Sequence, residues 1–95
     1  MKQVEARVLT TQGGKYVRQL CKHWSHKLPV ELEGDTGVVT FVGAVATMKA
    51  DDEAIAVTIR GGNHDDLDRL KDVAAKHIDR FAFREAPLAY AWTWH

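Results

Sequence analysis

Two stretches of this 95-residue chain repeat apolar side chains at the spacing of an α-helix, so each must bury one side. The first stripe comprises Tyr16, Val17, Leu20, Cys21 and Trp24. The second comprises Leu67, Leu70, Val73, Ala74, His77, Ile78 and Phe81. Other segments alternate apolar and polar residues, the pattern of strands with one buried face. Two helical stripes are most economically buried against one face of a single sheet.

The predicted strands cover residues 4–9, 30–33, 38–49 and 54–60. In the third of them, Gly43 predicts a bulge within a continuing strand. Short turns join the last three, which favours an antiparallel meander. Beyond Pro87, Tyr90, Trp92 and Trp94 alternate with smaller residues, which predicts a short last strand or an extended tail on the core.

These elements predict one α+β domain over residues 1–95, a two-layer sandwich. An antiparallel sheet carries both helices on one face, in the order β-α-β-β-β-α with a final β where the tail pairs. At the helix starts, Thr10 or Thr11 is expected to cap the first helix and Asn63 the second, because their side-chain oxygens accept backbone N–H bonds.

Charge and composition exclude several classes of protein. Basic and acidic residues number 13 each, and a chain of zero formal charge is not expected to bind nucleic acid non-specifically. No apolar run is long enough to span a membrane. The single cysteine and the absence of an apolar signal core predict a cytoplasmic protein. Zero net charge also favours self-association, for example as a homodimer.

Three of the five histidines lie near the ends of the predicted helices and define the candidate site. With about 100° per residue, His77 lies at the centre of the second stripe, His23 at the border of the first, and His26 outside it. Arg80 and Arg84 lie toward one edge of the second stripe. If His77 faces His23, these side chains would line a pocket for a carboxylate or phosphate. The competing interpretation is a structural histidine bonded to a backbone carbonyl or a carboxylate.

Two further interpretations use the same residues. His23 and His26 are three residues apart and could share an iron or zinc ion with Cys21 or His77. Cys21 and His23 diverge on a regular helix, however, and no paired-cysteine or His-Glu-x-x-His motif supports a metal site. Cys21 could instead act as a nucleophile, although a cysteine on an apolar stripe also fits a small buried side chain.

Long segments of the chain resemble the signature of a bacterial family of domains of unknown function, number 2218. These segments are Arg7-Val8 with Thr10, Tyr16 with Gln19–Lys27, and His77–Glu85. The matching positions of interest are Cys21, His23, Trp24, His26, His77, Arg80, Phe81, Arg84 and Glu85. The resemblance implies no catalytic role for them. It implies a small bacterial protein of no assigned activity. It also implies a link to siderophore uptake, because some members are encoded beside siderophore-uptake systems or fused to flavin-containing siderophore-interacting reductases.

The leading hypothesis is a small binding or accessory protein in iron or siderophore handling. His23, His77, Arg80 and Arg84 would bind a small anionic ligand or a ferric siderophore, with a siderophore-interacting reductase as partner. Two alternatives stay open: a small reductase or hydrolase using His77 or Cys21, and a structural homodimer formed through the aromatic tail and one sheet face. A polar cavity between His23 and His77 would favour a ligand site, whereas a gap filled by aromatic rings would favour a structural role.

Overall fold

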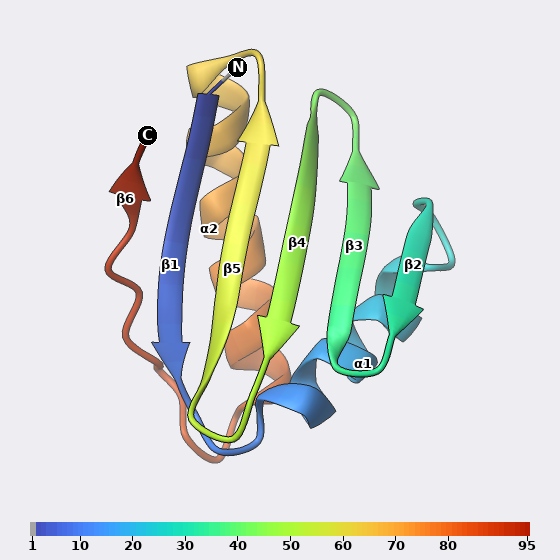
Figure 1. Cartoon of the computed structure of the whole chain (residues 1–95), viewed down its shortest axis with the longest axis vertical. Helices are drawn as coiled ribbons and strands as arrows, with labels where there is room; N and C mark the ends of the chain where they lie inside the picture. Colours follow the sequence, from blue (N-terminus) through green and yellow to red (C-terminus); the bar gives the residue numbers. More distant parts are fainter. Residues whose placement is uncertain (1) are drawn as a thin grey trace.

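The computed structural model describes residues 2–95 and arranges them in two layers (Figure 1). Six strands form one antiparallel sheet: β1 (Lys2–Leu9), β2 (Val30–Glu33), β3 (Thr36–Phe41), β4 (Ala44–Ala50), β5 (Ala54–Gly61) and β6 (Thr93–Trp94). Two helices, α1 (Gly13–Trp24) and α2 (His64–Phe81), cover one face of that sheet. The predicted α+β sandwich is therefore confirmed.

The strands lie in the order β2-β3-β4-β5-β1-β6, so β1 is inserted beside β5 and away from β2. The predicted meander is present from β2 to β5. Because β1 and β2 lie in different halves of the sheet, α1 crosses behind it and packs on β3 and β4 on its way to β2 (Figure 1). The second helix packs behind β5 and β1. The two helices also contact each other, and the last turn of α1 meets the second half of α2.

One predicted strand is wrong, because residues 38–49 form two strands, β3 and β4. Gly43 has φ +87°, a conformation that side-chain-bearing residues rarely adopt, and with Val42 it reverses the chain. Phe41 then pairs with Ala44 across a two-residue connection. Alternation of apolar and polar residues continues on both sides of the turn, so periodicity alone does not reveal it. The observed order has four strands between the helices, one more than predicted.

The core lies between the helices and the sheet, and the predicted helical stripes supply much of it. Its largest fully buried side chains are Leu20, Met48, Ile55, Ile59, Leu67, Ile78, Val4, Val8, Val17, Val39, Val57 and Cys21. Packing is close where α1 crosses β3. A Cβ atom on Gly37 would overlap the Cys21 Sγ, so any larger residue there would push helix and sheet apart.

One of the two cap predictions is confirmed. The Asn63 side chain accepts the backbone N–H of Asp65 at 2.8 Å and begins α2. The prediction for α1 is wrong, because Gln12 occupies the N-cap position and makes no side-chain cap bond. The Thr10 hydroxyl accepts the Gln12 N–H at 3.1 Å and donates to a distant carboxylate, that of Glu85. The Thr10 side chain, which the local sequence predicts to cap α1, therefore makes a tertiary contact instead.

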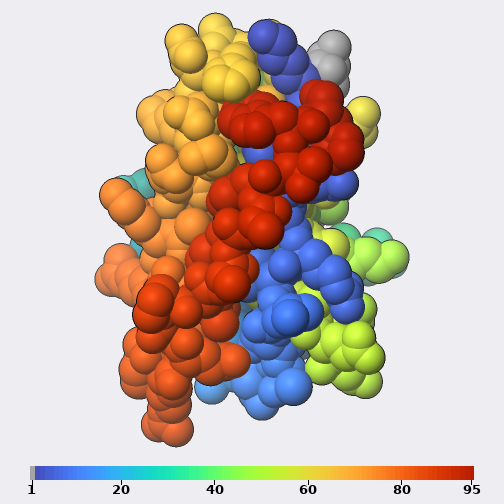
Figure 2. Space-filling view, turned by 90° about the vertical axis from the view of Figure 1, so that its left-hand side faces the viewer, coloured from blue at the N-terminus to red at the C-terminus, as the bar shows by residue number. Residues whose placement is uncertain are grey.

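The C-terminal segment after α2 returns along β1 as an extended tail, which Figure 2 shows lying between α2 and β1. Only its last part pairs as β6, so both predicted forms of the tail are present. The Tyr90 hydroxyl donates to Asp79 at 2.9 Å, and Trp94 stacks on His64 with ring centroids 4.2 Å apart. Among residues 2–95, no helix combines the length and apolar character that crossing a membrane requires.

Candidate functional site

The two histidines that the sequence places on facing helical stripes meet in the structure. His23 lies in the last turn of α1 and His77 in the second half of α2, and their ring centroids are 5.4 Å apart with the planes tilted by 47°. His23 is exposed and His77 is half-buried. The contact forms because α1 ends against α2, so the helical wheel placed both rings correctly.

Aromatic side chains surround this histidine pair. Trp24 packs on His77 with centroids 5.1 Å apart, and Phe81 meets His23 edge-on at 5.9 Å. Trp24 also packs edge-to-face with Phe41 from β3, with ring centroids 5.3 Å apart. Three hollows of the surface lie elsewhere, beside β1 and the tail and on the two sides of β2, and neither histidine lines any of them. The histidines therefore form part of an aromatic-backed surface, which differs from the pocket that the sequence suggests.

A backbone hydrogen bond fixes the orientation of His77. Its Nδ1 lies 2.8 Å from the carbonyl oxygen of Val73 one turn earlier. Since a carbonyl can only accept, Nδ1 carries the proton in the neutral ring. Nε2 of His77 is then the nitrogen left for a proton or a ligand. This bond is the one that the structural interpretation predicts, and it also gives the ring a fixed direction.

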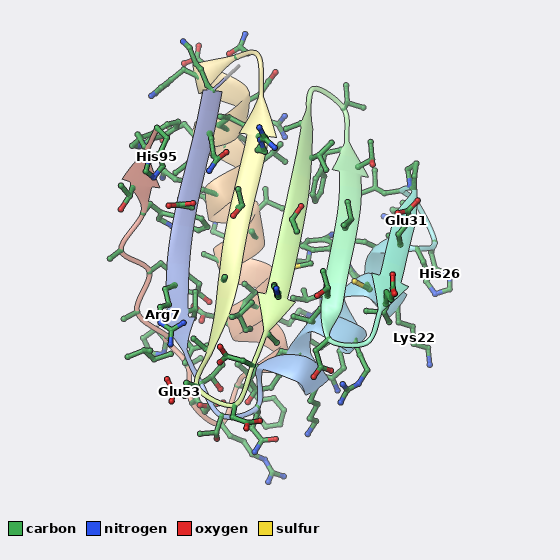
Figure 3. The ribbon with its side chains drawn as sticks, in the orientation of Figure 1. Arg7, Lys22, His26, Glu31, Glu53 and His95 are labelled. Carbon is green, nitrogen blue, oxygen red and sulfur yellow. The ribbon has the colours of Figure 1, made fainter. Side chains whose placement is uncertain are left out.

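Positive charge gathers around His23. The pKa of His23 is lowered from its ordinary 6.5, first by partial desolvation of the ring and then by the charges of His77, Arg80, Lys27 and His26. We call these five residues the basic patch. His23, His26, Lys27 and Arg80 are all exposed. In Figure 3, His26 points outward from the end of α1, on the side of the molecule next to β2. The patch thus holds several cationic side chains within range of one imidazole.

Arg84, the fourth residue of the predicted site, lies with a different group of side chains. Its guanidinium lies 5.7 Å from the ring centre of Phe83, and its charge acts on Tyr16. It belongs with a cluster in which Thr10 and Tyr16 both donate to the carboxylate of Glu85. The structure therefore brings together His23, His77 and Arg80 and separates Arg84 from them.

The Thr10–Tyr16–Glu85 cluster joins the start of α1 to the segment after α2. Thr10 Oγ1 lies 2.9 and 3.0 Å from the two carboxylate oxygens of Glu85, and both hydroxyl-bearing residues are 5% exposed. The pKa of Tyr16 is raised to about 12, first by its hydrogen bond to Glu85 and then by burial. Sequence reasoning did not find this cluster, because Thr10 and Glu85 are 75 residues apart and no local pattern connects them.

The metal candidates do not converge. Cys21 is 1% exposed and faces Gly37 of β3, whereas His23 and His26 lie on the surface. Burial raises the pKa of the Cys21 thiol, which disfavours the thiolate that metal binding or nucleophilic attack requires. Within residues 2–95, no three His, Cys, Asp or Glu side chains are grouped so that they could hold a metal ion.

Comparisons with known proteins agree with the fold. A family model described as "Uncharacterized protein conserved in bacteria (DUF2218)" matches residues 5–93. The chain is also similar to a protein of Pseudomonas aeruginosa, PA4090, whose structure was determined by NMR. The two share 30% sequence identity with a TM-score of 0.85, over 98% of this chain and 96% of that one. No curated protein matches the chain.

Proposed function

The chain belongs to this family of uncharacterised bacterial proteins, and we propose that it is a small binding or accessory protein whose basic patch binds an anion. One observation carries the proposal: His77 lies with its ring 5.4 Å from that of His23, and the other side chains that act on His23, namely Arg80, Lys27 and His26, are basic as well. An anion placed among them would relieve their mutual repulsion. It would also accept charge-assisted hydrogen bonds from the guanidinium of Arg80, from the imidazole of His23, and from Nε2 of His77 once that nitrogen is protonated.

The aromatic backing narrows the class of ligand. Phe81 is half-buried beside His23, so the patch combines cations with an apolar margin. That combination suits a planar anion such as an aromatic carboxylate or a catecholate. A ferric siderophore of negative net charge has the same chemistry and brings its own iron ligands. The family resemblance supplies this setting, together with a siderophore-interacting reductase as the proposed partner.

The test is a titration of the protein with salicylate and with a ferric catecholate siderophore, followed by calorimetry at low and moderate salt. We expect binding that weakens with salt and falls by about tenfold or more in a His23→Ala, Arg80→Ala double variant. Arg84→Ala is the matched control, since it removes the same charge from the other cluster. Equal affinities for the wild type and the double variant would rule out the basic patch as the binding site.

A purely structural role for the histidine pair is the second candidate. It is favoured by the aromatic packing around His77 and by its bond to Val73. In that case the uncovered face of the sheet would serve the protein's interactions, including a homodimer. His77→Ala would then lower the melting temperature without changing any binding, whereas the anion-binding proposal requires that affinity also falls. If His77 instead acts in an enzyme, the rate of turnover should depend on pH with a pKa typical of histidine.

A further inference from the structure

The strand β2 is one edge of the sheet and lies at the opposite edge from β6. It pairs with β3 on one side only, through four residues (Figure 1). A strand in this position has backbone groups that another extended chain can bond. The ability of this edge to bind another strand does not depend on anion binding by the basic patch.

The direction of the free backbone groups follows from the register. The amide of Thr40 donates to the carbonyl of Pro29 at 3.0 Å. Hydrogen-bonded pairs recur at every second residue of an antiparallel ladder. The backbone groups of Glu31 and Glu33 are therefore turned toward β3. The backbone groups of the two apolar residues of β2, Val30 and Leu32, point away from the sheet.

The two apolar residues are Val30 and Leu32, and their side chains face the helical layer. They pair with Val39 and Gly37, both buried on that side. The end of α1 covers them incompletely, so Leu32 is 45% exposed. A groove of about 250 Å³ remains between α1 and β2, lined by Arg18, Cys21, Lys22, Ser25, Val30 and Leu32.

The other face of β2 is acidic. Glu31 and Glu33 lie there with Thr36 and Val38 around an open hollow of about 330 Å³. Figure 3 shows Glu31 at this edge of the sheet, above Lys22, which extends from α1 behind it. An incoming strand would therefore meet carboxylates on one face and an apolar groove on the other.

Pairing of β2 with β2 of a second copy is disfavoured by these glutamates. In antiparallel pairing, directly opposite residues share one face of the sheet. Among the registers that let the outward backbone groups of Val30 and Leu32 bond each other, the two with the greatest overlap place Glu31 opposite Glu31, or Glu31 opposite Glu33, of the other copy. Like charges in opposite positions destabilise a strand pair. Charge at this edge thus disfavours pairing with a second β2 strand and favours pairing with a basic strand.

We propose that β2 binds an extended segment of a partner protein as a seventh strand of the sheet, with basic and apolar residues alternating along that segment. The N–H and C=O groups of Val30 and Leu32 would bond its backbone. Its basic side chains would lie beside Glu31 and Glu33, and its apolar side chains would enter the groove beside Leu32. Alternation is required because successive side chains of a strand point to opposite faces.

The test uses a short capped peptide of alternating lysine and valine, with alternating glutamate and valine as its matched control. Binding is followed by amide chemical shifts and hydrogen exchange of the ¹⁵N-labelled protein. We expect the lysine peptide to slow exchange at the amides of Val30 and Leu32. Those of Glu31 and Glu33, already turned to β3, should change little. The zero net charge of the chain limits non-specific attraction of the basic peptide.

Two variants make the test decisive. Leu32→Pro removes an outward N–H and leaves the ladder to β3 intact, so it should weaken peptide binding by about tenfold while circular dichroism stays unchanged. Glu31→Lys with Glu33→Lys should reverse the preference toward the glutamate peptide. Equal binding of both peptides, protection away from β2, or no binding of the lysine peptide would overturn the proposal. Dimerisation of the free protein through β2 would overturn it as well.

Discussion

Two groups of polar side chains, one near the start of α1 and one near its end, join this helix to α2 and the segment after it, and they have opposite character. In the Thr10–Tyr16–Glu85 cluster, two buried hydroxyls donate to one carboxylate, so donors and acceptor complement each other. In the basic patch, the four side chains that act on His23 are all basic. The first region is complete without a ligand, whereas the second has unbalanced charge that an anion would neutralise.

This difference separates structural polar residues from candidate functional ones better than residue type does. Histidine and arginine at the ends of both helices suggest one site from the sequence. In the structure, Arg84 belongs to the balanced cluster and Arg80 to the unbalanced patch. Replacing residues in the first should change stability, and replacing residues in the second should change affinity.

The largest effect is expected from Glu85→Ala. Loss of the carboxylate leaves the hydroxyls of Thr10 and Tyr16 buried without their acceptor, which should lower the free energy of unfolding by about 2–3 kcal/mol. Urea denaturation measures the change. Glu85→Gln, which keeps one acceptor oxygen, should lose less. A loss smaller than about 0.5 kcal/mol for Glu85→Ala would show that the cluster is not stabilising.

The next effect concerns pH. The folded protein holds the pKa of Tyr16 at about 12, above its ordinary 10.0, so between these values the folded state binds the proton that the unfolded state has lost. The stabilisation is fully present below pH 10 and is lost as pH rises through about 12. We expect the wild type to lose up to about 2 kcal/mol more than Tyr16→Phe over this range. Parallel stability curves for the two proteins would contradict this.

A smaller effect is expected from Arg80→Ala in the basic patch. It should leave the free energy of unfolding within about 0.5 kcal/mol of the wild type, because the side chain is exposed. Salicylate affinity should nevertheless fall by about tenfold. Denaturation and calorimetry on the same preparation separate the two quantities. A variant that loses stability and keeps its affinity would assign Arg80 to the structural class.

The smallest effect is a shift in the titration of His23. Its lowered pKa means that the unfolded state binds the proton more readily, so this group lowers stability as pH falls below 6.5. An NMR titration of the imidazole should give a pKa below 6.5 in the free protein. It should give a higher value in Arg80→Ala and on addition of an anion, which then binds with uptake of a fraction of a proton. A pKa unchanged by both would remove the electrostatic support for anion binding.

Local patterns in the sequence predict which faces of the helices and strands are buried. That information was sufficient to predict the two-layer fold and the approach of His23 to His77. Both follow from the helical period. The turn at Gly43 was missed because apolar residues alternate through it. The role of Thr10 was missed because its partner, Glu85, is far away in the sequence. The aromatic filling around His77 depends on Trp24 and on the angle between the helices, which residue spacing does not specify.

The position of β1 has a consequence for the order in which the protein can fold during its synthesis. Val4 pairs with Ile59 of β5 and with Trp94 of the tail. A chain emerging from the ribosome can form the meander from β2 to β5 as soon as those residues are free, because their contacts are local. The first strand to appear must remain without its partners until β5 emerges, and it is enclosed on both sides only after nearly the whole chain has been made. Such distant pairings slow folding, so the alternating apolar residues of β1 stay exposed on the nascent chain until β5 and the tail have been made.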